Sequence, residues 1–146
     1  MTLREKLIGI ALKWHQAYGN APGITGTLGE YDAAMMVGCT EEEYRGQMRD
    51  RSVVARGYDF KHCGKRYQVR ANRPSGRRGS PVTWVRKPRN YEWDFFVWVH
   101  YNTDFQPREV WLWPVADFRA RLGEKRRLSP ADIRQGKRLY PKHDEG

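Results

Sequence analysis

The chain has 146 residues, a length that allows one domain with a single core. Lys and Arg number 27 against 17 Asp and Glu, giving a net charge of +10, which favours a polyanionic partner such as nucleic acid. No apolar run approaches the length of a membrane span, and the N-terminus carries no export signal, so we expect no membrane segment and a cytoplasmic protein.

The two cysteines, Cys39 and Cys63, form no CxxC or Cys/His spacing. Structural zinc sites in short motifs depend on such spacings, so the sequence predicts none here. Reduced thiols also agree with a cytoplasmic setting.

The N-terminal region predicts a helix from Thr2 to Tyr18, because Thr2 and Glu5 match a capping box. The apolar residues of this helix recur at helical spacing, and we expect them to pack in the core. They are Leu3, Leu7, Ile10, Ala11, Trp14 and Tyr18. Gly19-Asn20 ends the helix.

A second helix is predicted from Thr25 to Val37, and its Glu30 has two interpretations. Thr27 as N-cap with Glu30 three residues later would form another capping box. The alternative is that Glu30 contributes to a metal site. A carboxylate folded back on its own N-cap amide is not available to a metal, so the two interpretations compete. Both interpretations of Glu30 stay open on the sequence alone.

The segment after Cys39 carries a third helix signal in Thr40 and Glu43. The stretch that follows, EEEYRGQMRDR, is highly charged, and its Gly46 weakens a helix. We expect this stretch to be a solvated face.

A β-hairpin is predicted within Gly57 to Asn72, where two alternating runs flank a Cys63-Gly64 turn signal. A two-residue loop would place Asp59 opposite Gln68. Alternation then gathers four apolar side chains on one face of the hairpin. They are Tyr58, Phe60, Tyr67 and Val69.

The other face of the hairpin would carry Asp59, Gln68 and Arg70. Cross-strand neighbours lie about 5 Å apart and diagonal ones roughly 7–8 Å, which suits a hydrated divalent ion beside a phosphate. An ordinary wet polar face is the alternative interpretation. A three-residue loop would move Asp59 off the Gln68 face, so this interpretation depends on a tight turn.

Asp59, the hairpin and the sequence Gln68-Val69-Arg70, preceded by Glu30 in a helix, resemble the PD-(D/E)XK nuclease superfamily in its D…QxK variant. The resemblance covers Thr25 to Leu122 and implies a restriction-endonuclease-like fold. By this resemblance Asp59 binds the metal, Gln68 stands at the second acidic position and Glu30 is the additional acid of the first core helix. Arg70 stands where the family has lysine.

The region from Arg73 to Arg89 is rich in Gly, Pro, Ser and basic residues and predicts a mobile loop with a short strand at Val82 to Val85. Such a loop could clamp a phosphate backbone, and a merely solvated linker is the alternative. The candidate nucleic-acid-binding residues are Arg73, Arg77, Arg78, Arg86, Lys87 and Arg89.

The C-terminal part predicts a central strand from Trp93 to Tyr101 and another from Val110 to Val115. Asp117 is the expected cap of a short helix, and Ser129-Pro130 starts another. Residues 1–140 should form one α/β (α+β) domain with a central mixed β-sheet flanked by helices, and 141–146 a disordered tail.

The sequence therefore favours an endonuclease that hydrolyses DNA with Mg²⁺ or Mn²⁺, held by the oxygens of Asp59, Gln68 and Glu30. The alternative is a nuclease-like nucleic-acid-binding module without catalysis. A basic partner domain of a larger complex is a third possibility, and a homodimer remains open.

Overall fold

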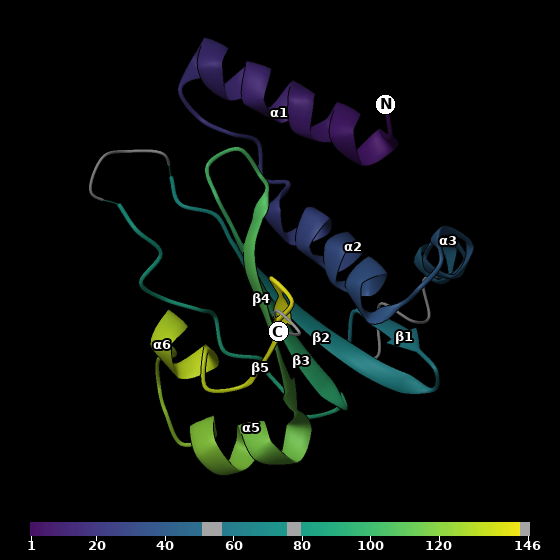
Figure 1. Ribbon diagram of the computed structural model, residues 1–146, viewed down its shortest axis with the longest axis vertical. Coiled ribbons are helices and arrows are strands. Elements are labelled where there is room, and N and C mark those ends of the chain that lie inside the picture. Colours follow the sequence, from purple (N-terminus) through teal and green to yellow (C-terminus); the bar gives the residue numbers. More distant parts are fainter. Residues whose placement is uncertain (51–56, 76–79, 144–146) are drawn as a thin grey trace.

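The computed structural model describes residues 1–50, 57–75 and 80–143. A five-stranded mixed sheet carries helices on both faces (Figure 1), which confirms the predicted α+β class. The strands lie in chain order across the sheet: β1 (Phe60–His62), β2 (Lys65–Asn72), β3 (Phe95–Tyr101), β4 (Pro107–Pro114) and β5 (Lys137–Tyr140). Strands β2 and β3 are parallel, and the other neighbours are antiparallel.

The helices are α1 (Leu3–Tyr18), α2 (Thr25–Val37), α3 (Glu41–Arg49), α5 (Val115–Leu122) and α6 (Pro130–Ile133). Helix α2 packs on β2 and β3, and α5 contacts the same sheet through β3 and β4. Among the described residues no helix combines the length and apolar character needed to cross a membrane.

Strand β3 lies at the centre of the sheet, as predicted, and every residue from Phe96 to Tyr101 is buried. Alternate side chains divide between two cores. Val97 and Val99 face a core shared with α1 and α2, whereas Phe96 and Trp98 face a core shared with α5 and α6. The run of aromatic and β-branched residues suits a strand covered on both sides.

Helix α1 has the predicted capping box of Thr2 and Glu5, but of the predicted packing stripe only Ala11 is buried. Four residues of the expected apolar stripe are exposed: Leu3, Ile10, Trp14 and Tyr18. The buried residues of this helix are Ile8 and Ala11.

A partly buried ion pair explains this rotation of α1. Arg4 donates to both oxygens of Asp32 on α2, at 2.7 and 3.0 Å, and the Tyr101 hydroxyl donates to Asp32 Oδ2 at 2.6 Å. Arg4 shares one helix face with Ile8 and Ala11, at spacings of four and three residues. The pair therefore turns that face inward and the Trp14 face outward.

Two predictions for the second half of the chain need correction, and one strand was missed. Val82 to Val85 forms no strand, and only Val85 makes an isolated bridge, to Leu128. The N-cap of α5 is Pro114, whose extended backbone ends β4, so Asp117 lies in the first helical turn instead of capping it. Strand β5 was not predicted.

The capping box of Ser129 and Asp132 forms as expected at the start of α6. In the predicted tail, Pro141, Lys142 and His143 are exposed. Residues 144–146 lie outside the described part of the chain.

Candidate functional site

The hairpin has the predicted two-residue turn. His62 pairs with Lys65, and the loop residues Cys63 and Gly64 have φ of 50° and 74°. Two positive φ values match the right-handed twist of the flanking strands. The register, set by Phe60 opposite Tyr67, brings Asp59 level with Gln68.

The apolar face of the hairpin is confirmed for three of its four predicted members. Phe60 and Tyr67 stack with ring centroids 4.9 Å apart, and Val69 joins the same core. Tyr58 instead packs in the core on the other side of the sheet. The chain bends at residues 57–59 before β1 begins, so strand alternation does not extend back to Tyr58.

Asp59 lies at the open edge of β2, just before β1 starts. Its Oδ2 accepts a hydrogen bond from the Val69 amide at 2.7 Å and from Gln68 Nε2 at 3.1 Å. The Asp59 amide in turn donates to the Tyr67 carbonyl at 2.8 Å. The carboxylate thus takes the place of a strand partner for β2 and is fixed in orientation.

Glu30 reaches Asp59 from α2, and the two carboxyl groups share a hydrogen bond. The capping-box interpretation of Glu30 is wrong, since α2 begins after Ile24 without a side-chain cap. Gly29 permits the close approach of the helix: a Cβ there would lie 2.4 Å from the Ala71 Cβ.

The two carboxyl groups have raised pKa values. Burial is the main cause for Glu30, the neighbouring Asp59 adds to it, and the pKa of Glu30 rises to about 8. Burial also raises the pKa of Asp59, against the opposing effects of the Val69 amide, Glu30 and Arg70. Both carboxyl groups therefore hold a proton more tightly than exposed carboxyl groups do.

Arg70 provides the cation of the site. Its charge favours the ionised forms of both Asp59 and Glu30, so it lies close to the pair. Nη1 donates to the Val69 carbonyl at 3.3 Å, whereas the buried Nε has no hydrogen-bond partner among the described residues. A buried donor without a partner is costly, so this nitrogen is an unsatisfied group beside the carboxyl pair.

Tyr44 on α3 lies near enough to the carboxyl pair for both charges to affect its pKa, and sequence reasoning missed it. Burial raises the pKa of its phenol, and the charges of Glu30 and Asp59 add to this effect. Tyr44 lies within a stretch expected to be a solvated face. Its signal in the sequence was the single aromatic residue among the charged residues of α3.

The candidate nucleic-acid-binding residues divide into two groups. Arg86 and Arg89 are exposed, and their charges lower the pKa of Arg70 after the larger effect of burial, so both lie near the site. Two others have structural partners. Arg73 donates to the Thr103 carbonyl, and Lys87 donates to the carbonyls of Gly123 and Lys125. Arg77 and Arg78 lie outside the described residues.

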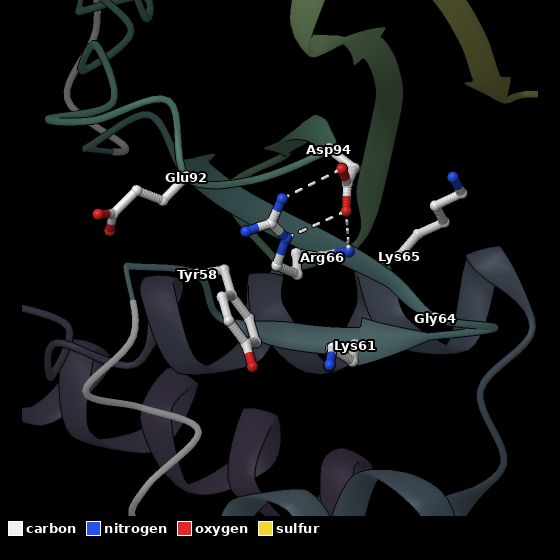
Figure 2. A pocket seen from close by; sticks show the side chains of 7 residues that line it. All are labelled: Tyr58, Lys61, Gly64, Lys65, Arg66, Glu92 and Asp94. Carbon is white, nitrogen blue, oxygen red and sulfur yellow. Dashed lines mark hydrogen bonds and ion pairs between the residues drawn. The ribbon is translucent and has the colours of Figure 1, made fainter.

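A broad pocket of about 740 Å³ lies beside the hairpin and does not include the carboxyl pair (Figure 2). Arg66 and Asp94 cross it through an ion pair of 3.2 Å, and Lys61 and Lys65 line its rim. The ion pair with Arg66 holds the pKa of Asp94 below its usual range, so this carboxylate is already neutralised by a partner. Glu30 and Asp59 lie outside this pocket.

No family model matches the chain, and no curated protein matches it. The assignment of a function therefore depends on the site itself. Its parts are two carboxyl groups in contact, an amide beside them, a buried guanidinium and two exposed arginines. This combination can hold a divalent cation next to a phosphodiester.

Proposed function

We propose that this protein is a metal-dependent nuclease that hydrolyses phosphodiester bonds of DNA at Glu30 and Asp59. The observation that carries the proposal is the meeting of these carboxyl groups, from α2 and from the start of the hairpin, beside Arg70. This arrangement also supports the inferred PD-(D/E)XK relationship and a restriction-endonuclease-like fold, with Arg70 at the position of the family's lysine.

The donor set fits magnesium or manganese. Glu30 and Asp59 offer carboxylate oxygens, and Gln68 offers a neutral amide oxygen, and hard divalent cations prefer such ligands. A divalent charge would favour the ionised forms of both carboxyl groups, against the burial that raises their pKa values. When bound, such an ion lowers the pKa of a water molecule and offsets charge on the scissile phosphate.

The remaining residues would position the substrate. Arg70, which stays charged, would bind a non-bridging phosphate oxygen through its guanidinium. Arg86 and Arg89 would hold neighbouring phosphates of the backbone without reading sequence. Asp59 keeps its orientation through the Val69 amide, so it needs no rearrangement on binding.

The decisive experiment compares wild type with Asp59→Asn on supercoiled plasmid and on single-stranded DNA, with Mg²⁺, Mn²⁺ or EDTA. Asparagine keeps an oxygen that can accept from the Val69 amide, so the fold should persist while metal-dependent cleavage is lost. Asp117→Asn, exposed on α5, is the matched control and should cut like wild type. Cleavage by a well-purified Asp59→Asn protein would remove the proposed site.

The second candidate is a nuclease-like module that binds nucleic acid without cutting it. Gln68 supports this alternative, because an amide beside Asp59 adds no negative charge and so lowers the affinity for a cation. The same assay separates the two functions: a binding module would retain DNA at moderate salt in EDTA and show no cleavage with either metal. Both free thiols, Cys39 and Cys63, agree with the cytoplasmic setting that we propose.

A further inference from the structure

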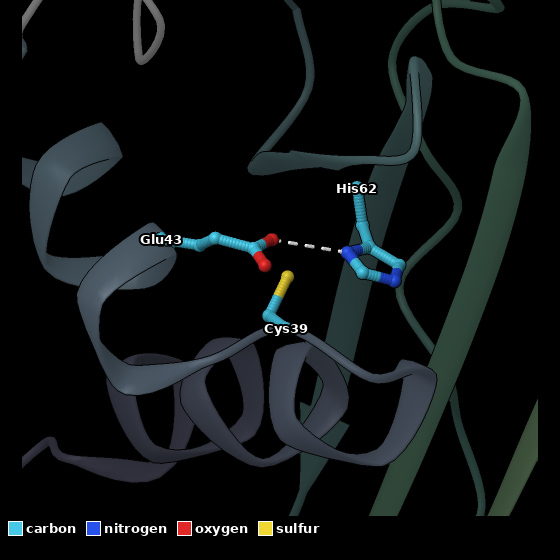
Figure 3. A group of neighbouring side chains, drawn as sticks. All are labelled: Cys39, Glu43 and His62. Atoms are coloured by element: carbon cyan, nitrogen blue, oxygen red, sulfur yellow. Dashed lines mark hydrogen bonds and ion pairs between the residues drawn. The ribbon is translucent and has the colours of Figure 1, made fainter.

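A second cluster of potential ligands lies at the other end of β1. Cys39, Glu43 and His62 each offer one ligand atom, and these atoms all lie within 4.8 Å of one another. Figure 3 shows the Cys39 sulfur beside the Glu43 carboxylate, which faces the His62 ring. Nδ1 of His62 lies 3.2 Å from Glu43 Oε2.

Three different elements bring these side chains together. Gly38 ends α2 in the left-handed conformation, at φ 110°, and directs the chain so that Cys39 is buried against β1. Thr40 caps α3 by accepting from the Glu43 amide, which leaves the Glu43 side chain to turn toward His62.

Hydrogen bonds from a side chain of α3 to the backbone of β1 hold the two elements together. The side chain of Gln47 on α3 pairs with both backbone groups of Lys61, accepting from its amide at 2.6 Å and donating to its carbonyl at 2.7 Å. The cluster therefore lies on a fixed junction between α3 and the hairpin. Glu43 is exposed and His62 is half-buried, so an ion can enter from solvent.

We propose that Cys39, Glu43 and His62 bind a zinc ion, with water in the fourth position. A thiolate, an imidazole and a carboxylate are all zinc ligands, with bonds of about 2.0–2.3 Å. Tetrahedral coordination would bring the ligand atoms to roughly 3.3–3.8 Å from one another, a separation that follows from those bond lengths. Glu43 and His62 can supply this contraction by side-chain rotation.

The same geometry assigns Cys63 a different role. Its sulfur lies 3.4 Å from Nε2 of His62, the ring nitrogen opposite the one that faces Glu43. A group at the second nitrogen orients a metal-binding imidazole without ligating the metal. Cys63 should therefore steady His62, and the two thiols should differ in their effect on binding.

The zinc site is distinct from the carboxyl pair in both place and chemistry. Glu30 and Asp59 present only oxygen, which suits a hard cation, whereas a thiolate selects a softer one. Zinc at Cys39 would fasten α3 and the end of α2 to the hairpin that carries Asp59. Zinc binding by these three residues does not require the protein to be a nuclease.

The test is direct metal binding to the full chain, reduced, freed of metal with EDTA and desalted. Zn²⁺ affinity would be measured by calorimetry, and Co²⁺ would be added in parallel because its absorption reports thiolate ligation. We expect one ion per chain, a thiolate–cobalt band and a raised unfolding temperature. Cys39→Ser, Glu43→Gln and His62→Gln should each weaken zinc binding at least about tenfold, the least that loss of even an orienting group costs at such sites.

Two matched controls separate the site from its surroundings. Cys63→Ser and Asp59→Asn should keep nearly the wild-type affinity, since neither removes a ligand and the serine hydroxyl can still hydrogen-bond Nε2 of His62. Circular dichroism of every variant checks the fold, and the exposed Glu43 gives a variant that cannot disturb a core. The proposal is overturned if zinc does not bind, if Cys63→Ser weakens binding as much as Cys39→Ser, or if folded Glu43→Gln and His62→Gln bind like wild type.

Discussion

The carboxyl group of Glu30 shares a hydrogen bond with Asp59 across the junction of α2 and the hairpin. The two residues are far apart in the chain, and each is held by its own element. Glu30 comes directly after Gly29, whose close contact with Ala71 positions α2 on the sheet. Asp59 is held in orientation by the Val69 amide. Movement of either element would separate the pair, so its integrity can be tested by substitution at a distance.

Gly29→Ala should disturb the site although it touches neither carboxyl group. The new Cβ would lie 2.4 Å from the Ala71 Cβ, so α2 must move away from β2. Overpacking of this kind costs about 1–3 kcal/mol, and we expect a loss of that size in the free energy of unfolding. Chemical denaturation measures it, and any metal-dependent cleavage should fall as well.

Gly26→Ala is the matched control on the same helix. Nothing lies within 4 Å of a Cβ at Gly26, so alanine there should gain up to about 1 kcal/mol from helix propensity. Equal stabilisation by both substitutions would show that α2 does not rest on Ala71 as closely as we describe.

Stability should depend on pH through Glu30. The pKa of this carboxyl rises on folding from 4.5 to about 8, so the unfolded chain releases the proton first. The stability contributed by Glu30 is complete below pH 4.5 and is lost as pH rises to about 8. Glu30→Gln stays neutral, and its unfolding temperature relative to wild type should rise across that window.

Thermal unfolding of both proteins in EDTA, from acid to mildly alkaline pH, provides the measurement. Glu42→Gln, at an exposed position of α3, should follow the wild-type curve throughout. Parallel curves for wild type and Glu30→Gln would mean that Glu30 ionises alike in both states.

Substitutions at Arg70 test whether this residue acts only as a positive charge or also through the planar geometry of its guanidinium. Arg70→Ala removes the only cation whose charge is shown to act on both Glu30 and Asp59 among the described residues, and we expect cleavage to fall about a hundredfold. Arg70→Lys keeps the charge but loses the two-pronged geometry that suits phosphate, so binding and cleavage should both fall by less. Nicking rates compared side by side provide the test, and equal metal-dependent rates for all three proteins would exclude Arg70 from the chemistry.

Arg86 and Arg89 should account for part of the salt dependence of DNA binding. Each phosphate contact contributes about 0.9 to the slope of log affinity against log salt on duplex DNA. Arg86→Gln together with Arg89→Gln should therefore flatten the slope by about 1.8. Lys6→Gln with Lys13→Gln on α1 makes the same change in net charge and should flatten it less. Matching slopes for the two double variants would mean that DNA binding depends on the net charge of the protein and not on the positions of Arg86 and Arg89.

The hairpin was predictable because its information is local. The Cys63-Gly64 turn, the alternation around it and the position of Asp59 opposite Gln68 all follow from neighbouring residues. The buried strand β3 and the capped start of α1 follow in the same way, from composition and from the capping-box residues Thr2 and Glu5. The mixed sheet flanked by helices could be expected from the order of such elements.

The sequence alone could not choose between the two interpretations of Glu30, nor the inward face of α1. Both depended on partners distant in the chain: Asp59 and the Gly29 contact for Glu30, and the buried Asp32 for Arg4. The grouping of Cys39, Glu43 and His62 is of the same kind, because no spacing rule joins three different elements. Local patterns determined the elements of this protein, whereas the docking of α1, α2 and α3 decided which polar side chains meet, since burial and charge act through space and not along the chain.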